Sequence, residues 1–173
     1  MSIFGIFRSL MSNKLGAIYV CFCMTIIAIS IVQIILRKLN EKKKKELIKR
    51  LASNSIELPV SEFINLRKNP SRSYTRYSSN KVEDFTGVYI IFNKTKNMYY
   101  VGQAKKVIQR VNNHFAGRGN GDVYADFKYG DDFTIRTIAL NSSGYTSLDR
   151  LEKDTIAAYN AYSEGYNRNR GNN

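Results

Sequence analysis

Residues 86–102 read TGVYIIFNKTKNMYYVG, and this stretch decides the fold of the second half of the chain. Two short apolar runs, rich in β-branched and aromatic residues, flank the polar turn NKTKN at residues 93–97. Such runs on either side of a turn predict a β-hairpin. The runs carry GVY at residues 87–89 and YVG at residues 100–102. A glycine near a strand tyrosine leaves room for a backbone or a ligand to approach.

The residues that follow predict two longer helices, one short helix and one further strand. Apolar residues recur at helical spacing in residues 104–115 and 147–162, and residues 122–129 predict the short helix. Residues 133–140 alternate apolar and polar side chains, which predicts a strand. Residues 85–173 are therefore expected to form an α/β domain, with a three-stranded antiparallel sheet flanked by helices.

The amino-terminal segment, residues 1–36, contains an apolar run of different character. Residues 17–36 read AIYVCFCMTIIAISIVQIIL, twenty residues without a charge. At about 1.5 Å per residue, such a helix crosses a hydrocarbon core of roughly 30 Å. A signal peptide is the alternative, but its apolar region is shorter and leads to small residues at a cleavage site. Here the run leads to Arg37 and Lys38, so we expect one uncleaved transmembrane helix.

The positive charge of the chain is concentrated before the predicted sheet. Residues 1–84 hold 15 Lys and Arg against 6 Asp and Glu, whereas residues 85–173 hold 12 against 8. The net charge of +13 implies an anionic partner, either nucleic acid or anionic lipid. Because most of the excess lies outside the predicted α/β domain, basicity alone is weak evidence that this domain acts on nucleic acid.

Residues 37–84 are expected to form a basic helix and a linker, with a short helix at residues 59–66 and a polar tether at residues 68–81. Residues 37–50 contain eight Lys and Arg against two Glu. The positive-inside rule therefore places the carboxyl-terminal domain in the cytoplasm. The same residues are expected to contact anionic lipid head groups, with a solvated helix as the alternative.

Glu152 lies in an unexpected place on the predicted helix 147–162. The helical wheel puts it among the apolar residues Leu148, Leu151 and Ile156. A carboxylate on a buried face is costly unless it is paired or binds a cation. Glu152 is therefore expected either to form a buried ion pair or to bind a metal ion.

Arg110 and His114 are four residues apart on the predicted helix 104–115, so their side chains are neighbours. His114 is the only histidine of the chain. An adjacent arginine favours the neutral imidazole, which suits a general base or a hydrogen-bond relay. A histidine with a purely structural role is the alternative. The planar guanidinium of Arg110 suits a phosphate group.

These residues, in this order, resemble the signature of the GIY-YIG nuclease family, with valine for isoleucine in both halves. That family places an arginine in the helix after the second half and a His or Tyr one turn later. It places a metal-binding glutamate in a later helix and often an asparagine after an aromatic residue. The corresponding residues here are Arg110, His114, Glu152 and Asn167. Gln103 is a departure, because some members carry a lysine there.

The resemblance implies hydrolysis of phosphodiester bonds with one divalent cation, Mg²⁺ or Mn²⁺, held by Glu152. Tyr89 or Tyr100, helped by His114, would take the proton from the attacking water. Arg110 would stabilise charge on the phosphate, and Asn167 would orient Glu152 or a backbone segment. The residues expected to bind substrate are Gly102, Gln103, Lys105, Lys106 and Arg118.

The leading interpretation is a membrane-anchored endonuclease that acts on DNA, with RNA still open as a substrate. Low sequence specificity is expected because no separate DNA-reading motif is evident. One alternative is a non-catalytic module that binds nucleic acid or anionic lipid on a nuclease-like fold. Another is a nuclease toxin or defence effector.

Overall fold

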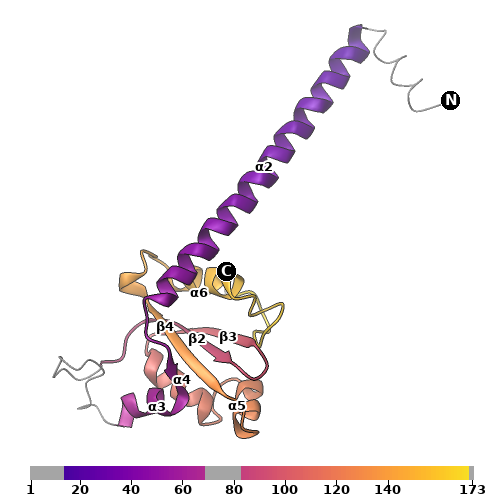
Figure 1. Cartoon of the computed structure of the whole chain (residues 1–173). Helices are drawn as coiled ribbons and strands as arrows, with labels where there is room; N and C mark the ends of the chain where they lie inside the picture. The colour runs from indigo at the N-terminus through magenta and orange to yellow at the C-terminus, as the bar shows by residue number, and fades with distance from the viewer. Residues whose placement is uncertain (1–13, 69–82, 172–173) are drawn as a thin grey trace. The chain divides into compact units, whose positions relative to one another are not determined.

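The computed structural model describes residues 14–68 and 83–171, and the chain divides into two compact units between Lys43 and Lys44. The elements are labelled in Figure 1. In chain order they are α2 (Lys14–Ser53), β1 (Leu58–Pro59), α3 (Val60–Lys68), β2 (Gly87–Asn93), β3 (Met98–Ala104), α4 (Val107–Phe115), α5 (Gly121–Lys128), β4 (Phe133–Ala139), the 3-10 turn η1 (Leu140–Ser142) and α6 (Leu148–Ala158). The predicted tether lies, from residue 69 on, outside the described residues.

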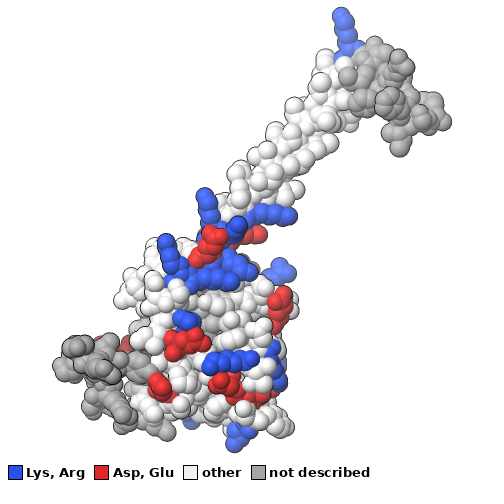
Figure 2. Space-filling view, viewed as in Figure 1, with Lys and Arg blue, Asp and Glu red and all other residues white. Residues whose placement is uncertain are grey.

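Helix α2 is continuous over 40 residues and contains the whole predicted span, residues 17–36. Among the described residues it is the one helix long and apolar enough to cross a membrane, and none of its most apolar window is buried. Figure 2 shows this stretch without charged side chains, followed by turns on which Lys and Arg gather. The helix therefore has the length and composition of a membrane span.

The second unit is built on a four-stranded sheet with the order β1-β4-β2-β3. All three pairings are antiparallel. The prediction of three strands is therefore wrong by one, because β1 was missed. This strand has only two residues and one of them is Pro59, so it carries no periodic signal. Its position at the edge of the sheet is where a proline is tolerated.

Helices cover both faces of the sheet (Figure 1). On one face α3, α4 and α5 pack over Tyr89, Ile91 and Ile135. On the other face α6 and the end of α2 pack over Val88, Ile90 and Ile138. The segment before the hairpin takes part in both cores. It contributes Ile48 and Ala52 to the second face, and Leu58, Val60 and Phe63 to the first.

Helix α6 is shorter than predicted, because it ends at Ala158 rather than Tyr162. Asn160 adopts a left-handed backbone conformation with φ of 52°. The amide of Ala161 donates to the carbonyl of Ile156, and the amide of Asn160 donates to the carbonyl of Ala157. This pair of hydrogen bonds is a Schellman motif, which terminates a helix and commonly uses Gly or Asn. Tyr162, at which the predicted helix ended, lies beyond this turn and is 44% exposed.

Candidate active site

Two positions of the hairpin require glycine, because neighbouring atoms leave no room for a Cβ atom. A Cβ atom on Gly102 would overlap the ring and hydroxyl of Tyr89, which stands opposite it in the strand pairing. A Cβ atom on Gly87 would overlap the carbonyl oxygen of Ile138 on β4. The room predicted beside the strand tyrosines therefore exists, and at Gly102 the side chain of Tyr89 fills it.

Tyr89 and His114 form a buried hydrogen-bonded pair. Tyr89 is 1% exposed and His114 is fully buried. The Tyr89 hydroxyl lies 2.9 Å from Nε2 of His114, and the backbone N–H of Asn120 donates to Nδ1 at 2.8 Å. An imidazole nitrogen that accepts a hydrogen bond carries no proton, so the neutral ring holds its proton on Nε2 and donates it to Tyr89.

Burial lowers the pKa of His114 to about 4, and the positive charge of Arg110 contributes in the same direction. The imidazole is therefore neutral at pH 7, and both of its nitrogens are already hydrogen-bonded. The sequence suggested that His114 acts either as a general base or as a hydrogen-bond relay. The arrangement fits a relay, because no ring nitrogen is left to accept a proton.

The loop after α4 places the Asn120 amide against His114. A Cβ atom on Gly119 would overlap the His114 ring, so glycine is needed for the close approach. The Asn120 side chain accepts hydrogen bonds from the amides of Asp122 and Val123 and caps α5. Asn120 is not among the site residues predicted from the sequence. The available signal was an asparagine two residues before the predicted helix 122–129, since asparagine is a preferred N-cap residue.

Tyr100 and Arg110 complete the cluster around Tyr89. The rings of Tyr89 and Tyr100 have centroids 6.2 Å apart. Burial raises the pKa of both hydroxyls, while Arg110 opposes the rise at each. The hydrogen bond from Tyr89 also lowers the pKa of Tyr100. The polar groups form a chain from the Asn120 amide through His114 and Tyr89 to Tyr100.

Glu152 and Tyr100 line a pocket of about 330 Å³. The residues that line this pocket are Tyr100, Val101, Asn120, Glu152, Asn167, Arg168 and Asn169. Glu152 is half-buried rather than enclosed in the core. The side-chain amide of Gln103 donates to Glu152 at 3.1 Å and to Asp149 at 2.5 Å. Asp149, which sequence reasoning did not single out, therefore lies close to this site through Gln103.

Asn167 is bound to the backbone of β3. Its side-chain oxygen accepts from the amide of Val101 at 2.9 Å, and its side-chain nitrogen donates to the carbonyl of Val101 at 2.8 Å. The amide of Tyr166 donates to the carbonyl of Tyr99. Because β3 is an edge strand, these contacts hold the strand segment that carries Tyr100. Asn167 was expected to orient either Glu152 or a backbone segment, and the hydrogen bonds of its side chain are with the backbone of Val101.

The order and geometry of these residues agree with a comparison against known families. Residues 85–167 match the family model of the GIY-YIG catalytic domain. This segment is a GIY-YIG domain. It runs from just before β2 to Asn167. The match supports a nuclease-type function in general, and such a function implies nucleic acid as the class of substrate. No curated protein and no solved structure matches the chain.

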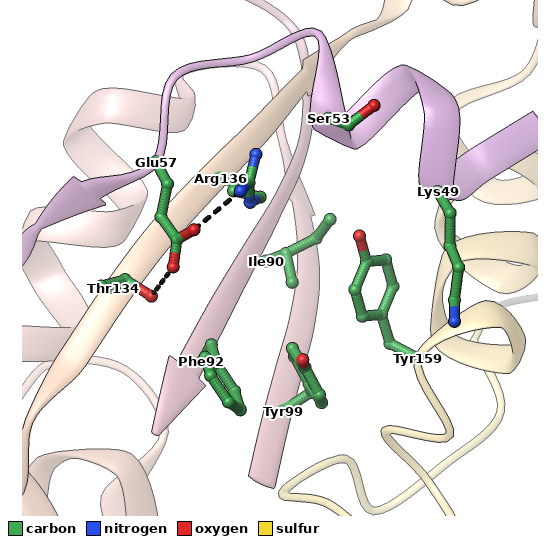
Figure 3. Close-up of a pocket in the computed structure, with 9 residues that line it drawn as sticks. All are labelled: Lys49, Ser53, Glu57, Ile90, Phe92, Tyr99, Thr134, Arg136 and Tyr159. Carbon is green, nitrogen blue, oxygen red and sulfur yellow. Dashed lines mark hydrogen bonds and ion pairs between the residues drawn. The ribbon is translucent and has the colours of Figure 1, made fainter. Parts of the chain in front are cut away.

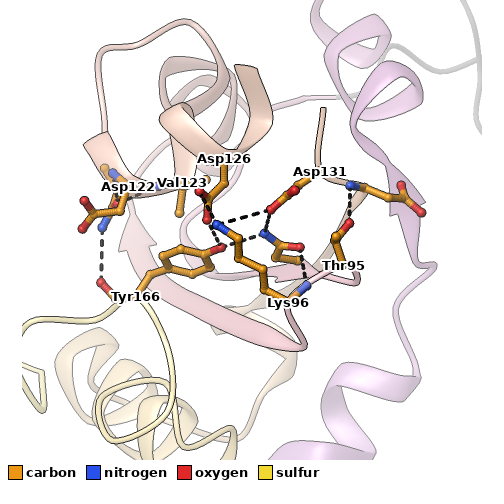
Figure 4. A network of polar contacts seen from close by, with 10 residues as sticks. Thr95, Lys96, Asp122, Val123, Asp126, Asp131 and Tyr166 are labelled. Atoms are coloured by element: carbon orange, nitrogen blue, oxygen red, sulfur yellow. Dashed lines mark hydrogen bonds and ion pairs between the residues drawn. The ribbon is translucent and has the colours of Figure 1, made fainter. Parts of the chain in front are cut away.

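A polar network anchors the last segment of the GIY-YIG domain (Figure 4). The Tyr166 hydroxyl donates to Asp126 at 2.6 Å and accepts from the Asn93 amide at 2.7 Å. Lys96 pairs with the same Asp126 at 2.6 Å. Arg168, which lines the Glu152 pocket, pairs with Asp122 at 3.1 Å. The network thus ties the segment around Asn167 to α5 and to the β2–β3 turn.

The donors at the Glu152 pocket fit a hard divalent cation. In the described part of the chain no group of three or more His, Cys, Asp or Glu side chains is arranged to hold a metal. Among the described residues, Glu152 is the single carboxylate that lines the pocket. Mg²⁺ is commonly held by one or two carboxylates and keeps several waters. An open pocket with one half-buried carboxylate suits that mode of binding.

Three predicted substrate-binding residues lie apart from this pocket. Lys105 and Lys106 are exposed in the connection between β3 and α4, and Arg118 is exposed in the next loop. Arg118 donates to the Asn113 side chain at 3.2 Å. None of the three lines the Glu152 pocket, so a role for them in substrate binding stays a prediction.

Proposed function

We propose that the chain is a membrane-anchored, divalent-metal-dependent endonuclease that hydrolyses DNA with low sequence specificity. One observation carries the proposal: the GIY-YIG domain brings a tyrosine relay and Arg110 beside the pocket that Glu152 lines. A tyrosine oxygen, a cation for phosphate and a carboxylate for a metal are the groups that phosphodiester hydrolysis needs.

Tyr100 is the proton acceptor in this mechanism. Tyr100 lines the pocket, whereas Tyr89 is buried and its hydroxyl is bonded to His114. Tyr89 stabilises the phenolate of Tyr100 by donating its own hydrogen bond, and His114 keeps Tyr89 in place. Arg110 favours the same phenolate because it lowers the pKa of Tyr100.

Glu152 would hold the divalent cation, Mg²⁺ or Mn²⁺. The negative charge of Glu152 raises the pKa of Tyr100. When bound, the cation supplies positive charge that offsets this effect and stabilises the charge of the scissile phosphate. Gln103 orients Glu152 by its hydrogen bond, and Arg110 faces the phosphate. Asn167 acts as a positioning residue, since it fixes the strand on which Tyr100 stands.

Helix α2 anchors the GIY-YIG domain at the membrane, with the domain on the cytoplasmic side. The length and hydropathy of the helix support a span, and the basic residues after it support the orientation. Contact of residues 37–50 with anionic head groups is part of the same proposal. Within this stretch Lys44 also pairs with Asp154 at 3.4 Å.

A cleavage assay tests the proposed function. The full chain, purified into nanodiscs of zwitterionic lipid, is incubated with linear duplex DNA, circular duplex DNA, single-stranded DNA and RNA. We expect DNA fragments without a preferred sequence in Mg²⁺ and intact DNA in EDTA. Binding without cleavage of any of the four would indicate a non-catalytic module, and cleavage of RNA alone would contradict the assignment of DNA.

A further inference from the structure

A second pocket of about 330 Å³ lies on the face of the sheet covered by α6 (Figure 3). It shares no lining residue with the Glu152 pocket. Phe92 and Tyr99 form part of its floor at the turn end of β2 and β3. Because side chains alternate along a strand, Tyr99 points to the opposite face from Tyr100. The second pocket is therefore separate from the tyrosine relay.

Three aromatic rings border this pocket. Phe92 and Tyr99 are stacked, with centroids 4.4 Å apart and an angle of 16° between the rings. Tyr159, at the end of α6, lies 4.9 Å from Tyr99 at 54°. All three side chains are partly exposed. Adjacent rings with an accessible face form a platform on which a nucleic-acid base stacks.

The acidic group in the pocket is neutralised by its neighbours (Figure 3). Glu57 pairs with Arg136 at 2.7 Å and accepts a hydrogen bond from Thr134 at 2.5 Å. Arg136 also donates to the carbonyl oxygens of Ala52 and Ser55. These polar groups bind one another, so Glu57 does not repel an anionic ligand.

Two lysines of α2 supply positive charge. Lys49 lines the pocket, and Lys45, one turn earlier, lines an adjoining pocket of about 190 Å³. The two pockets share Lys49, Tyr99 and Tyr159, so they form one groove. The adjoining pocket is also lined by Glu164, which accepts a hydrogen bond from the Asn160 side chain at 3.3 Å, so the two lysines outnumber the one carboxylate there. Within residues 14–68 and 83–171, neither lysine has a hydrogen bond or ion pair. Both ammonium groups are thus available to a ligand.

We propose that this groove binds an unpaired nucleotide of a nucleic-acid strand, with its base against Tyr99 and Tyr159 and its phosphate at Lys45 and Lys49. A lipid head group would satisfy the lysines but has no aromatic face for the rings, so the combination favours a nucleotide. The proposal rests on the nucleic-acid binding of the proposed function and not on cleavage. The groove gives the domain a second contact with a single-stranded part of its substrate.

The test measures binding of a short fluorescein-labelled oligothymidylate to the full chain in zwitterionic nanodiscs. EDTA is present throughout, so the measurement does not depend on nuclease activity. We expect Lys49→Gln and Tyr159→Leu each to weaken binding about tenfold, as loss of a stacking or phosphate contact does. Tyr159→Phe keeps the ring and should bind like the unaltered chain. Thermal unfolding verifies that each variant is folded.

Matched controls remove the same groups outside the groove. Lys43→Gln takes one charge from the same basic run, and Tyr129→Leu takes an exposed tyrosine that is 89% accessible. Both should change the affinity less than about twofold. Wild-type affinity in Tyr159→Leu, or an equal loss in Lys43→Gln, would overturn the proposal. Competition by inositol phosphate as strong as that by thymidine monophosphate would also overturn it, because stacking would then play no part.

Discussion

At the scale of single residues, two glycines shape the geometry around Tyr89 as much as the functional side chains do. Gly102 leaves the space that the Tyr89 ring occupies, and Gly119 leaves the space that the His114 ring needs. The sequence indicated that glycines and tyrosines belonged together. It did not indicate which tyrosine would be buried, because both face α4 and the difference depends on β2 being a central strand and β3 an edge strand.

Gly102→Ala tests the tight contact with Tyr89. The added methyl group must displace the Tyr89 ring, and overpacking of this kind costs about 1–3 kcal/mol. We expect a lower free energy of unfolding in urea and, because Tyr89 shifts away from Tyr100, a cleavage rate reduced about tenfold or more. Gly121→Ala is the matched control, since a Cβ atom there meets nothing within 4 Å. Equal stability of the two variants would contradict the contact.

His114 makes the stability of the domain depend on pH in a defined window. Its pKa is about 4 in the folded chain, against an ordinary value of 6.5. Between these values the unfolded chain binds a proton that the folded chain does not, so the free energy of unfolding falls as pH decreases from 6.5 to about 4. The loss is up to roughly 3 kcal/mol, at about 1.4 kcal/mol per unit of pKa shift.

Urea unfolding at a series of pH values measures this effect. His114 is the only histidine, so most of the change above pH about 5 belongs to it. In His114→Gln, which has no titrating ring, we expect stability to be nearly constant over the upper part of the window. The same pH dependence in both proteins would show that His114 is not the cause.

At the scale of elements, the sequence predicted those with strong periodicity and missed those held by tertiary contacts. The hairpin, α4 and β4 carry clear apolar patterns. Strand β1 has two residues and forms only because β4 offers an edge. The end of α6 depends on the backbone of Asn160, which helical periodicity does not report. Asp149 likewise joins the site only because Gln103 reaches it across from β3.

The segment between the predicted span and the hairpin is part of the fold. Ile48, Leu58, Val60 and Phe63 are all at most 7% exposed. Each buried side chain of this size contributes about 1.5–3 kcal/mol, against a total stability of about 5–15 kcal/mol for a domain. We expect a fragment that starts at Lys44 to unfold cooperatively, and one that starts at Glu83 to be largely unfolded. Circular dichroism with urea unfolding measures both.

A single substitution in the full chain checks the same point without truncation. Phe63→Ala should lower the free energy of unfolding by about 3–5 kcal/mol, because it leaves a cavity under β4. Ile56→Ala lies seven residues earlier at a side chain that is 59% exposed, and should change stability by less than about 0.5 kcal/mol. A small effect of Phe63→Ala would mean that α3 does not belong to the core.

At the scale of the whole molecule, the chain joins an apolar helix to a nuclease-type domain. The sequence predicted the helix well, because twenty uncharged residues are a strong signal. The sequence also identified most residues of the candidate site, because the family signature is visible in the order of Tyr89, Tyr100, Arg110, His114 and Glu152. The relay through Asn120 and the groove at Tyr159 depend on the folded loops, and no pattern in the sequence reported them.

The most direct test of the account compares Glu152→Gln with Glu83→Gln in the full chain. Both changes remove one carboxylate charge with little change in size, but Glu83 is exposed and lines neither the pocket beside Tyr100 nor the groove at Tyr159. We predict that Glu152→Gln lowers Mg²⁺-dependent cleavage of circular DNA roughly a hundredfold or more, while DNA binding in EDTA is unchanged. Glu83→Gln should cleave at the rate of the unaltered chain. Cleavage by Glu152→Gln at that same rate would contradict the account.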